Sequence, residues 1–216
     1  MQKKRVLTLQ IGSLLQARFP ALNEEQLRRA LAHATFASYK KGESLVEAGD
    51  IQTQLPILFQ GVFRGYALDP EGRDITDRFF FRRGSVLMGS CTLGRPSPIC
   101  IEAAAPSQCL MISIEVISRL LEEDAAYLRQ YNLLLVEAAE EQWRGKMALH
   151  CLTAMERYER FLQDYPGLIS TVCNRDIASF LGMTPVTLSR LRRKKREALG
   201  SAPTGTASRY PPSPQI

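Results

Sequence analysis

The sequence predicts an α+β protein with an antiparallel β-domain, a long helix and a small helical domain, in that order. Residues 35–113 hold short aliphatic and aromatic runs that are broken by Gly, Pro and Asp, as in β-sandwiches and barrels. Residues 114–150 then have the spacing of one long helix. Residues 151–197 form shorter helical patterns that end in a basic segment. A chain of 216 residues is long enough for two small domains or one large one.

Helical spacing also precedes the β-domain, over residues 9–34. Asn23 is a predicted N-cap for its second part, and Glu24 and Glu25 follow in the first turn, where the helix dipole favours carboxylates. Within the β-domain, the segment DPEGR at residues 69–73 predicts a hairpin turn. Residues 1–113 are therefore expected to combine N-terminal helices with a β-domain.

The long helix carries a leucine every seven residues, with small or polar residues between them. Such a seam is typical of paired helices, and a lone Asn on it often fixes the register. We expect residues 114–150 to pair two subunits in a homodimer, through Leu121, Leu128, Asn132 and Leu135. The alternative is a core helix that packs on its own β-domain.

Residues 151–197 begin with a capped helix and continue into two shorter helical patterns. Thr153 is a predicted N-cap with Glu156 as its capping-box partner, and Pro166 and Gly167 end that helix. Residues 198–216 contain four prolines and one charged residue, so we expect a disordered tail that is either native or foreign.

The pattern over residues 173–197 predicts a helix-turn-helix. Residues 174–181 have an amphipathic helical spacing, Gly182 suits a tight turn, and Thr184 and Pro185 are a strong helix start. Six cations and one anion follow within residues 186–197, although the whole chain carries a net charge of only +6. Concentrated positive charge indicates a polyanionic partner such as double-stranded DNA. An ordinary helical hairpin with a solvated basic end is the alternative.

Other classes of protein have little support in the sequence. The five cysteines are odd in number and widely spread, and neither His33 nor His150 has metal-ligand spacing, which indicates reduced thiols and no metal or other cofactor. No catalytic constellation or phosphate-binding glycine loop suggests an enzyme. The apolar start is interrupted by Thr8 and Gln10, so a cytoplasmic protein without a signal peptide or membrane segment is expected.

Taken together, the motifs resemble the Crp/Fnr family of transcriptional regulators over residues 1–197. The resemblance rests on KKGESLVEAGD, LPILFQGVFRGYAL, GRDITDRFFFRRGSV, the long helix and RDIASFLGMTPVTLSRLRRK. It implies a cupin-like β-roll (a jelly roll), a dimerisation helix and a DNA-binding helix-turn-helix, with RNA polymerase as a further candidate partner. By position, the residues expected to contact DNA are Asn174, Arg175, Thr184, Pro185, Val186, Thr187, Ser189, Arg190, Arg193, Lys194 and Lys195.

The chain departs from the cyclic-nucleotide-binding members of that family. Gly89 or Ser90 stands where those members have a Glu for the ribose, and Ser97 and Pro98 replace the Arg-Ser pair that holds the phosphate. We therefore expect an unknown small-molecule effector, or none, in place of cyclic AMP. The residues expected to line a residual pocket are Met88, Gly89, Ser90, Cys91, Arg95, Ser97, Tyr131 and Asn132. A ligand-binding regulatory module whose main role is not DNA binding is the alternative function.

Overall fold

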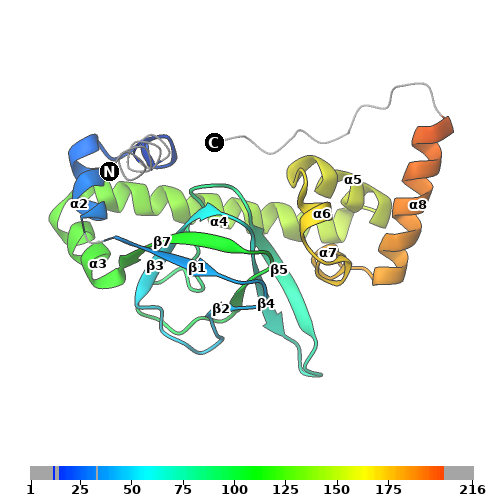
Figure 1. The fold of residues 1–216 in the computed structure, drawn as a ribbon, viewed down its shortest axis with the longest axis horizontal. Coiled ribbons are helices and arrows are strands. Elements are labelled where there is room, and N and C mark those ends of the chain that lie inside the picture. Colours follow the sequence, from blue (N-terminus) through cyan, green and yellow to red (C-terminus); the bar gives the residue numbers. More distant parts are fainter. Residues whose placement is uncertain (1–11, 13–14, 33, 202–216) are drawn as a thin grey trace.

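A computed structural model describes residues 12, 15–32 and 34–201 of the chain (Figure 1). Its β-domain consists of two antiparallel sheets. One has the order β1 (Thr35–Tyr39), β7 (Ser107–Ser113), β3 (Gln54–Gln60). The other has the order β2 (Ser44–Val46), β6 (Cys100–Ala103), β4 (Phe63–Leu68), β5 (Asp74–Phe80). The predicted antiparallel β-domain is confirmed.

The two sheets enclose an apolar core. Leu58, Phe63 and Ile101 of the strands are fully buried in it, and so is Leu87 of the segment between β5 and β6. The turn at residues 69–73 joins β4 to β5 as predicted, and the backbone amides of Glu71 and Arg73 donate to the carboxylate of Asp69. The resulting β4–β5 hairpin reaches toward the C-terminal helices (Figure 1).

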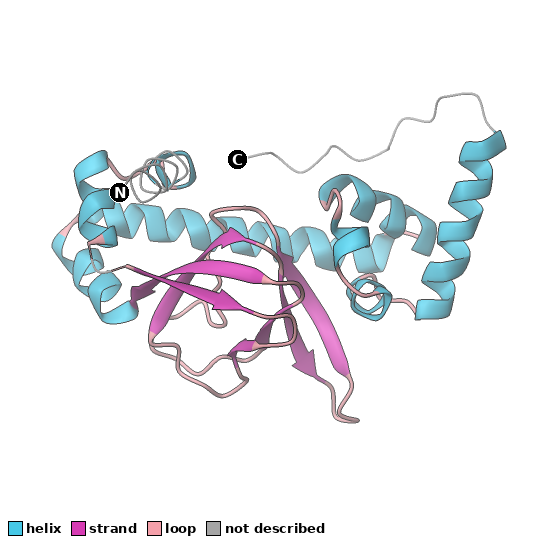
Figure 2. Cartoon of the chain, viewed as in Figure 1, coloured by secondary structure: helices cyan, strands magenta, loops and turns pink. Residues whose placement is uncertain are grey.

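Helices lie at both ends of the β-domain, and one long helix connects them (Figure 2). At the N-terminal end, α2 (Glu24–Leu31) has the predicted Asn23 cap, with Gln26 as its capping-box partner. The helices α3 (Ile114–Glu123) and α4 (Ala125–Cys151) follow the last strand. Among the described residues, α4 runs behind the sheets from α2 to the C-terminal helices (Figure 1).

The prediction of one continuous helix over residues 114–150 is wrong at Asp124. This residue has an extended backbone, φ −145° and ψ 118°, and its carboxylate accepts from the amide of Ala126, so it caps a new helix. Leu121 consequently lies on α3, where it packs against the core beneath the N-terminal helices. It is not in line with the other predicted seam residues, all of which are on α4.

The helical domain comprises α5 (Ala154–Asp164), α6 (Leu168–Thr171), α7 (Asn174–Phe180) and α8 (Pro185–Ser201). The capping box between Thr153 and Glu156 is confirmed. Helix α8 continues to Ser201, beyond the boundary predicted at residue 197. The rest of the expected tail, residues 202–216, lies outside the described residues, as do His33 and most of the apolar N-terminal segment.

Candidate nucleic-acid interface

The turn between α7 and α8 has the geometry of a helix-turn-helix. Gly182 adopts a left-handed backbone with φ 60°, a conformation that favours glycine. The Thr184 hydroxyl then accepts from the amide of Thr187 at 3.1 Å, and α8 starts at Pro185. The predicted Thr-Pro helix start is therefore confirmed.

The inner faces of the two helices share one core. Ile177, Ala178, Leu181 and Leu188 are buried there together with Phe161 of α5, which agrees with the amphipathic spacing predicted for residues 174–181. Leu191 is half-buried against the same cluster. Because α7 and α8 pack on common side chains, they form one unit. The packing of this core determines which side chains of the two helices face outward.

The outer face of α8 is exposed and cationic. Val186 is 60% exposed, and Ser189, Arg190, Arg193 and Lys194 are also exposed. Among the described residues, neither Arg190 nor Lys194 has an ion-pair partner, whereas Arg193 lies 3.7 Å from Glu197. A row of unengaged cations beside small polar side chains is suited to contacts with bases and phosphates.

Thr184 and Pro185 are exposed at the start of α8, whereas the other predicted DNA-binding residues outside that row already have partners within the protein. The Lys195 ammonium pairs with Glu159 of α5 at 3.0 Å, and Thr187 is half-buried beside Thr184. Asn174 accepts from Arg192 at 2.5 Å. Arg175 pairs with Asp74 of β5 at 3.0 Å. These side chains are engaged within the protein.

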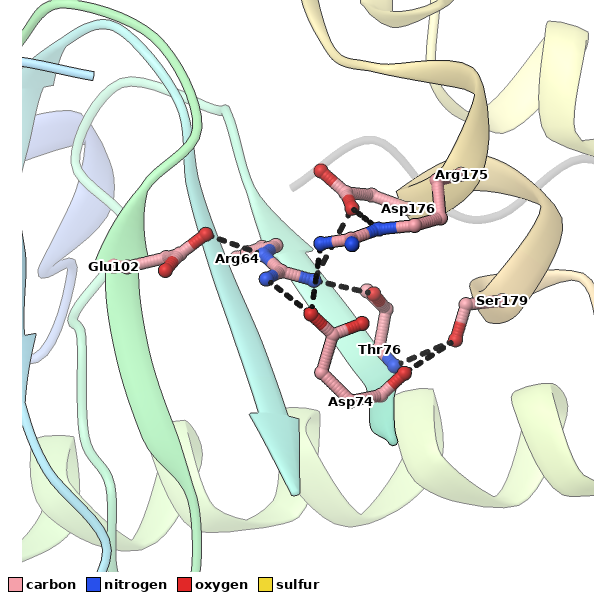
Figure 3. Close-up of polar contacts among 7 residues, drawn as sticks. All are labelled: Arg64, Asp74, Thr76, Glu102, Arg175, Asp176 and Ser179. Carbon is pink, nitrogen blue, oxygen red and sulfur yellow. Dashed lines mark hydrogen bonds and ion pairs between the residues drawn. The ribbon is translucent and has the colours of Figure 1, made fainter. Parts of the chain in front are cut away.

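Sequence reasoning missed a buried ion cluster that joins α7 to the β-domain (Figure 3). At its centre, Arg64 of β4 is 3% exposed and donates to three carboxylates, at 2.6 Å to Glu102, 3.0 Å to Asp74 and 3.2 Å to Asp176 of α7. It also stacks on the Tyr66 ring, 4.3 Å from the ring centroid. We call the seven residues drawn in Figure 3 the interdomain joint: Arg64, Asp74, Thr76, Glu102, Arg175, Asp176 and Ser179.

Arg64 and Asp74 hold each other in their ionised forms. Burial acts to lower the pKa of Arg64, but hydrogen bonds to Asp74 and Glu102 outweigh it and raise that pKa above its ordinary value. The hydrogen bond from Arg64 in turn lowers the pKa of Asp74. Arg64 lies in the apolar run VFRGYAL, and an arginine in such a strand was the one available signal. Its partner on α7 is 112 positions away, so no local pattern could identify the contact.

Aromatic rings pack beside the joint. Phe79 of β5 meets Phe180 of α7 edge to face at 5.3 Å, and it meets Phe161 of α5 and Tyr165, which directly follows α5, at 6.4 Å each. A cavity of about 610 Å³ is lined by residues of β5, α4, α5 and α7, and Thr76 and Ser179 are among them. The helical domain is therefore attached to the sheet through the joint and this aromatic cluster.

Three of the expected effector residues, Gly89, Ser97 and Tyr131, already have hydrogen-bond partners within the protein. The amide of Gly89 donates to Gln52 at 2.7 Å, the buried Ser97 hydroxyl donates to the carbonyl of Ile99 at 2.5 Å, and a Cβ on Gly89 would collide with Ser97. The Tyr131 hydroxyl donates to the carbonyl of Cys91 at 2.7 Å. Met88 and Ser90 are half-buried, whereas Arg95 and Asn132 are exposed.

Helix α4 presents an unpartnered apolar stripe on the side away from the cavity. Its large members are Leu128, Val136, Trp143 and Met147, and Trp143 is 71% exposed. These residues and the exposed Asn132 and Ala139 share one helical face, whereas Leu135 is half-buried at its side. The heptad count from Leu121 missed Val136, Trp143 and Met147, because steps of seven residues reach positions 135, 142 and 149 and pass over them.

The described residues contain neither a candidate membrane span nor a candidate metal site. No helix there is both long enough and apolar enough to cross a membrane. No group of three or more His, Cys, Asp or Glu side chains there is placed to hold a metal ion.

Comparison with known proteins agrees with this architecture. Residues 36–124 match the family model of the cyclic nucleotide-binding domain. FixK2 from Bradyrhizobium japonicum superposes with a TM-score of 0.70 at 22% identity, over 81% of this chain and 89% of that one. A protein from Eubacterium rectale assigned to the Crp/Fnr family of transcriptional regulators gives 0.68 at 20% identity, over 84% and 88%. The chain has the Crp/Fnr fold.

A third structural relative is the c-di-GMP-responsive global regulator CLP of Xanthomonas campestris. It superposes with a TM-score of 0.65 at 18% identity, over 81% of this chain and 92% of that one. No curated protein sequence matches the chain significantly. The predicted resemblance to Crp/Fnr regulators, with its jelly roll and helix-turn-helix, is thus confirmed in the fold.

Proposed function

We propose that this protein is a cytoplasmic, homodimeric transcriptional regulator that binds double-stranded DNA through α8. The observation that carries the proposal is the exposed outer face of α8, where Arg190 and Lys194 have no ion-pair partner among the described residues. An ordinary helical hairpin does not account for a cationic face directly after a capped helix start. The Crp/Fnr fold supports the same function.

In this proposal the first turns of α8 enter the major groove. Val186, Ser189 and Arg190 face the bases, because residues near the start of a recognition helix reach base edges. An arginine can bond both acceptors of a guanine, which makes Arg190 the main candidate for base recognition. Lys194 lies further along the helix and contacts phosphate, which adds affinity without sequence preference.

The apolar stripe of α4 is the proposed dimer interface. A tryptophan and three aliphatic side chains exposed on one helical face are expected to be covered by a second copy of α4. Two symmetric recognition helices then read a near-palindromic operator, with half-site centres roughly 34–36 Å apart or a multiple of this distance.

Replacing Leu128 with Asp places a charge in the proposed dimer interface, so sedimentation of this variant should show a monomer. A folded dimer with this change would place the interface elsewhere.

Cyclic AMP and cyclic GMP are not the proposed effectors. A buried cyclic phosphate needs a cation or several donors, and Ser97 and Pro98 provide neither a charge nor, at the proline, an amide. The Ser97 hydroxyl is moreover bonded to the carbonyl of Ile99. Isothermal titration of the dimer should detect no binding. Micromolar binding that disappears in Arg95→Ala would show that Arg95 holds the phosphate.

The DNA-binding proposal is tested by selecting bound fragments from genomic DNA, with and without cell-extract metabolites. We expect a palindromic consensus whose affinity falls steeply with salt, because neutralised phosphates release counterions. The alternative, a ligand-binding module that does not act on DNA, predicts no salt-dependent affinity for any fragment.

A further inference from the structure

Arg64 of β4 crosses the boundary between the β-domain and the helix-turn-helix. Its guanidinium bonds Glu102 and Asp74 on neighbouring strands, and its remaining nitrogen, Nη1, donates to Thr76 and to Asp176 of α7, each at 3.2 Å (Figure 3). A guanidinium is planar and its donors have fixed directions, so these partners can be satisfied together only when α7 occupies one position.

The position of α7 depends on Arg64, because this arginine neutralises carboxylates that would otherwise repel one another. The joint contains two cations, Arg64 and Arg175, and the three carboxylates of Asp74, Glu102 and Asp176. Without Arg64, three converging carboxylates would remain around a single and largely exposed arginine. Asp176 is itself buried. Repulsion from the other two carboxylates, and the hydration that Asp176 gains in solvent, would then favour release of α7 from the β-domain.

Helix α7 is held at its other end as well. The amide of Thr76 in β5 donates to the Ser179 hydroxyl at 2.9 Å, and Phe180 packs on Phe79. A helix of seven residues with attachments in its first and last turns cannot tilt without breaking one of them. Because α8 shares its core with α7, the recognition helix takes its orientation from these attachments.

We propose that Arg64 is the positioning residue that fixes the helix-turn-helix on the β-domain and so sets the spacing between half-sites that the dimer recognises. This inference rests on the proposed function. In a dimer, the distance between the two α8 helices is defined only if each is rigidly attached to its own subunit. Buried ionic groups are best known for specifying one arrangement among several, which is the role assigned to Arg64.

Two variants break the joint from opposite sides in the full-length protein. Arg64→Met removes the central cation, whereas Asp176→Asn removes only the carboxylate contributed by α7. The matched control is Arg73→Met, which is the same substitution on the same hairpin. The Arg73 side chain is 73% exposed, and among the described residues its ion-pair partners are Asp69 and Glu71 of its own turn. Arg64→Lys tests whether charge alone suffices, since an ammonium cannot reproduce the planar fork.

The first measurement is hydrogen exchange in the absence of DNA. Amides of α7 and β5 should exchange faster in Arg64→Met, Arg64→Lys and Asp176→Asn, whereas those of β1, β3 and β7 and the Arg73→Met protein should match the wild type. Unchanged exchange of the α7 amides in both Arg64→Met and Asp176→Asn would overturn the proposal. If Arg64→Met fails to fold, Asp176→Asn decides the matter alone.

The second measurement uses DNA with two copies of the selected half-site at a series of separations. The wild type and Arg73→Met should prefer one separation, and the joint variants should lose this preference while binding a single half-site as before. A retained preference in both joint variants would overturn the role of Arg64. A wild type that binds none of these DNAs would overturn the proposed function, and hydrogen exchange would still test the attachment of α7.

Discussion

The two helices of the helix-turn-helix differ in whether their polar side chains have partners within the protein. On α7, Arg175, Asp176 and Ser179 all bond to the β-domain. On α8, Arg190 and Lys194 are exposed and have no ion-pair partner among the described residues. One helix is therefore suited to attachment and the other to recognition. The difference lies in where the partners are, since each helix carries arginine and polar side chains in the sequence.

The largest expected effect comes from a change that disrupts the core shared by the two helices. Phe161 is 1% exposed and stacks on Tyr165 at 5.1 Å. Phe161→Ala should lower the free energy of unfolding by about 3–5 kcal/mol, because it removes a buried ring and leaves a cavity. Urea denaturation at fixed protein concentration measures the change. The control Phe36→Ala removes a ring that is 46% exposed and should cost far less, and equal losses would contradict the assignment of the core.

The comparison between α7 and α8 is sharpened by removing one arginine from each. Arg190→Ala should weaken binding at the cognate operator by about 1–3 kcal/mol and relax preference at one base pair per half-site. Arg175→Ala should leave the base preference unchanged, because the Arg175 side chain pairs with Asp74. Binding to a panel of operators with single substitutions measures both effects. Equal, sequence-independent losses from the two variants would contradict base recognition by Arg190.

A smaller effect distinguishes two neighbouring lysines of α8. Lys194 is exposed, whereas Lys195 pairs with Glu159 at 3.0 Å. Lys194→Ala should weaken binding to all sequences alike and reduce the salt slope by about one, as expected for a lost phosphate contact. Lys195→Ala should change the slope less. The slopes come from titrations at several salt concentrations, and the reverse order would show that the Glu159 pair opens on DNA.

The smallest effect is confined to acid and concerns the attachment of α7. The pKa of Asp74 is lowered in the folded protein, mainly by the hydrogen bond from Arg64. Its ionised form therefore contributes stability that is complete above the ordinary pKa of 3.8 and is lost as the pH falls through the lower folded value. The difference in thermal midpoint between wild type and Asp74→Asn should be constant near neutral pH. It should shrink as the pH falls through the lowered pKa of Asp74 in the folded protein. A difference that does not depend on pH would mean that the carboxylate charge is irrelevant.

Local signals in the sequence predicted much of the fold. The caps at Asn23, Thr153 and Thr184 and the turn at Gly182 were predicted correctly, because each depends on residues a few positions apart. The break at Asp124 was missed, since leucines spaced seven apart continue across it and conceal the change of axis. The reading face of α8 stays a prediction from the sequence, which the exposure of Arg190 supports.

Contacts between distant segments could not be read in the same way. Arg64 in an apolar strand suggests that the side chain has a partner, but nothing near it in the chain identifies Asp176. Arg175 and Lys195 looked like DNA contacts because their charge is visible in the sequence and their intramolecular partners are not. The exposure of Trp143 depends on which face of α4 the β-domain covers, and that is decided only by the tertiary fold.

The length of α4 turns small rotations into large displacements. Its 27 residues form a rod about 40 Å long, at 1.5 Å of rise for each residue. By simple lever geometry, tilting such a rod by about 5° at its N-terminal end moves the other end by roughly 3.5 Å, close to the 3.4 Å rise of one base pair. The joint with the β-domain must therefore oppose even slight tilts of α4 near Asp124, because each would otherwise displace the helical domain by about the rise of one base pair.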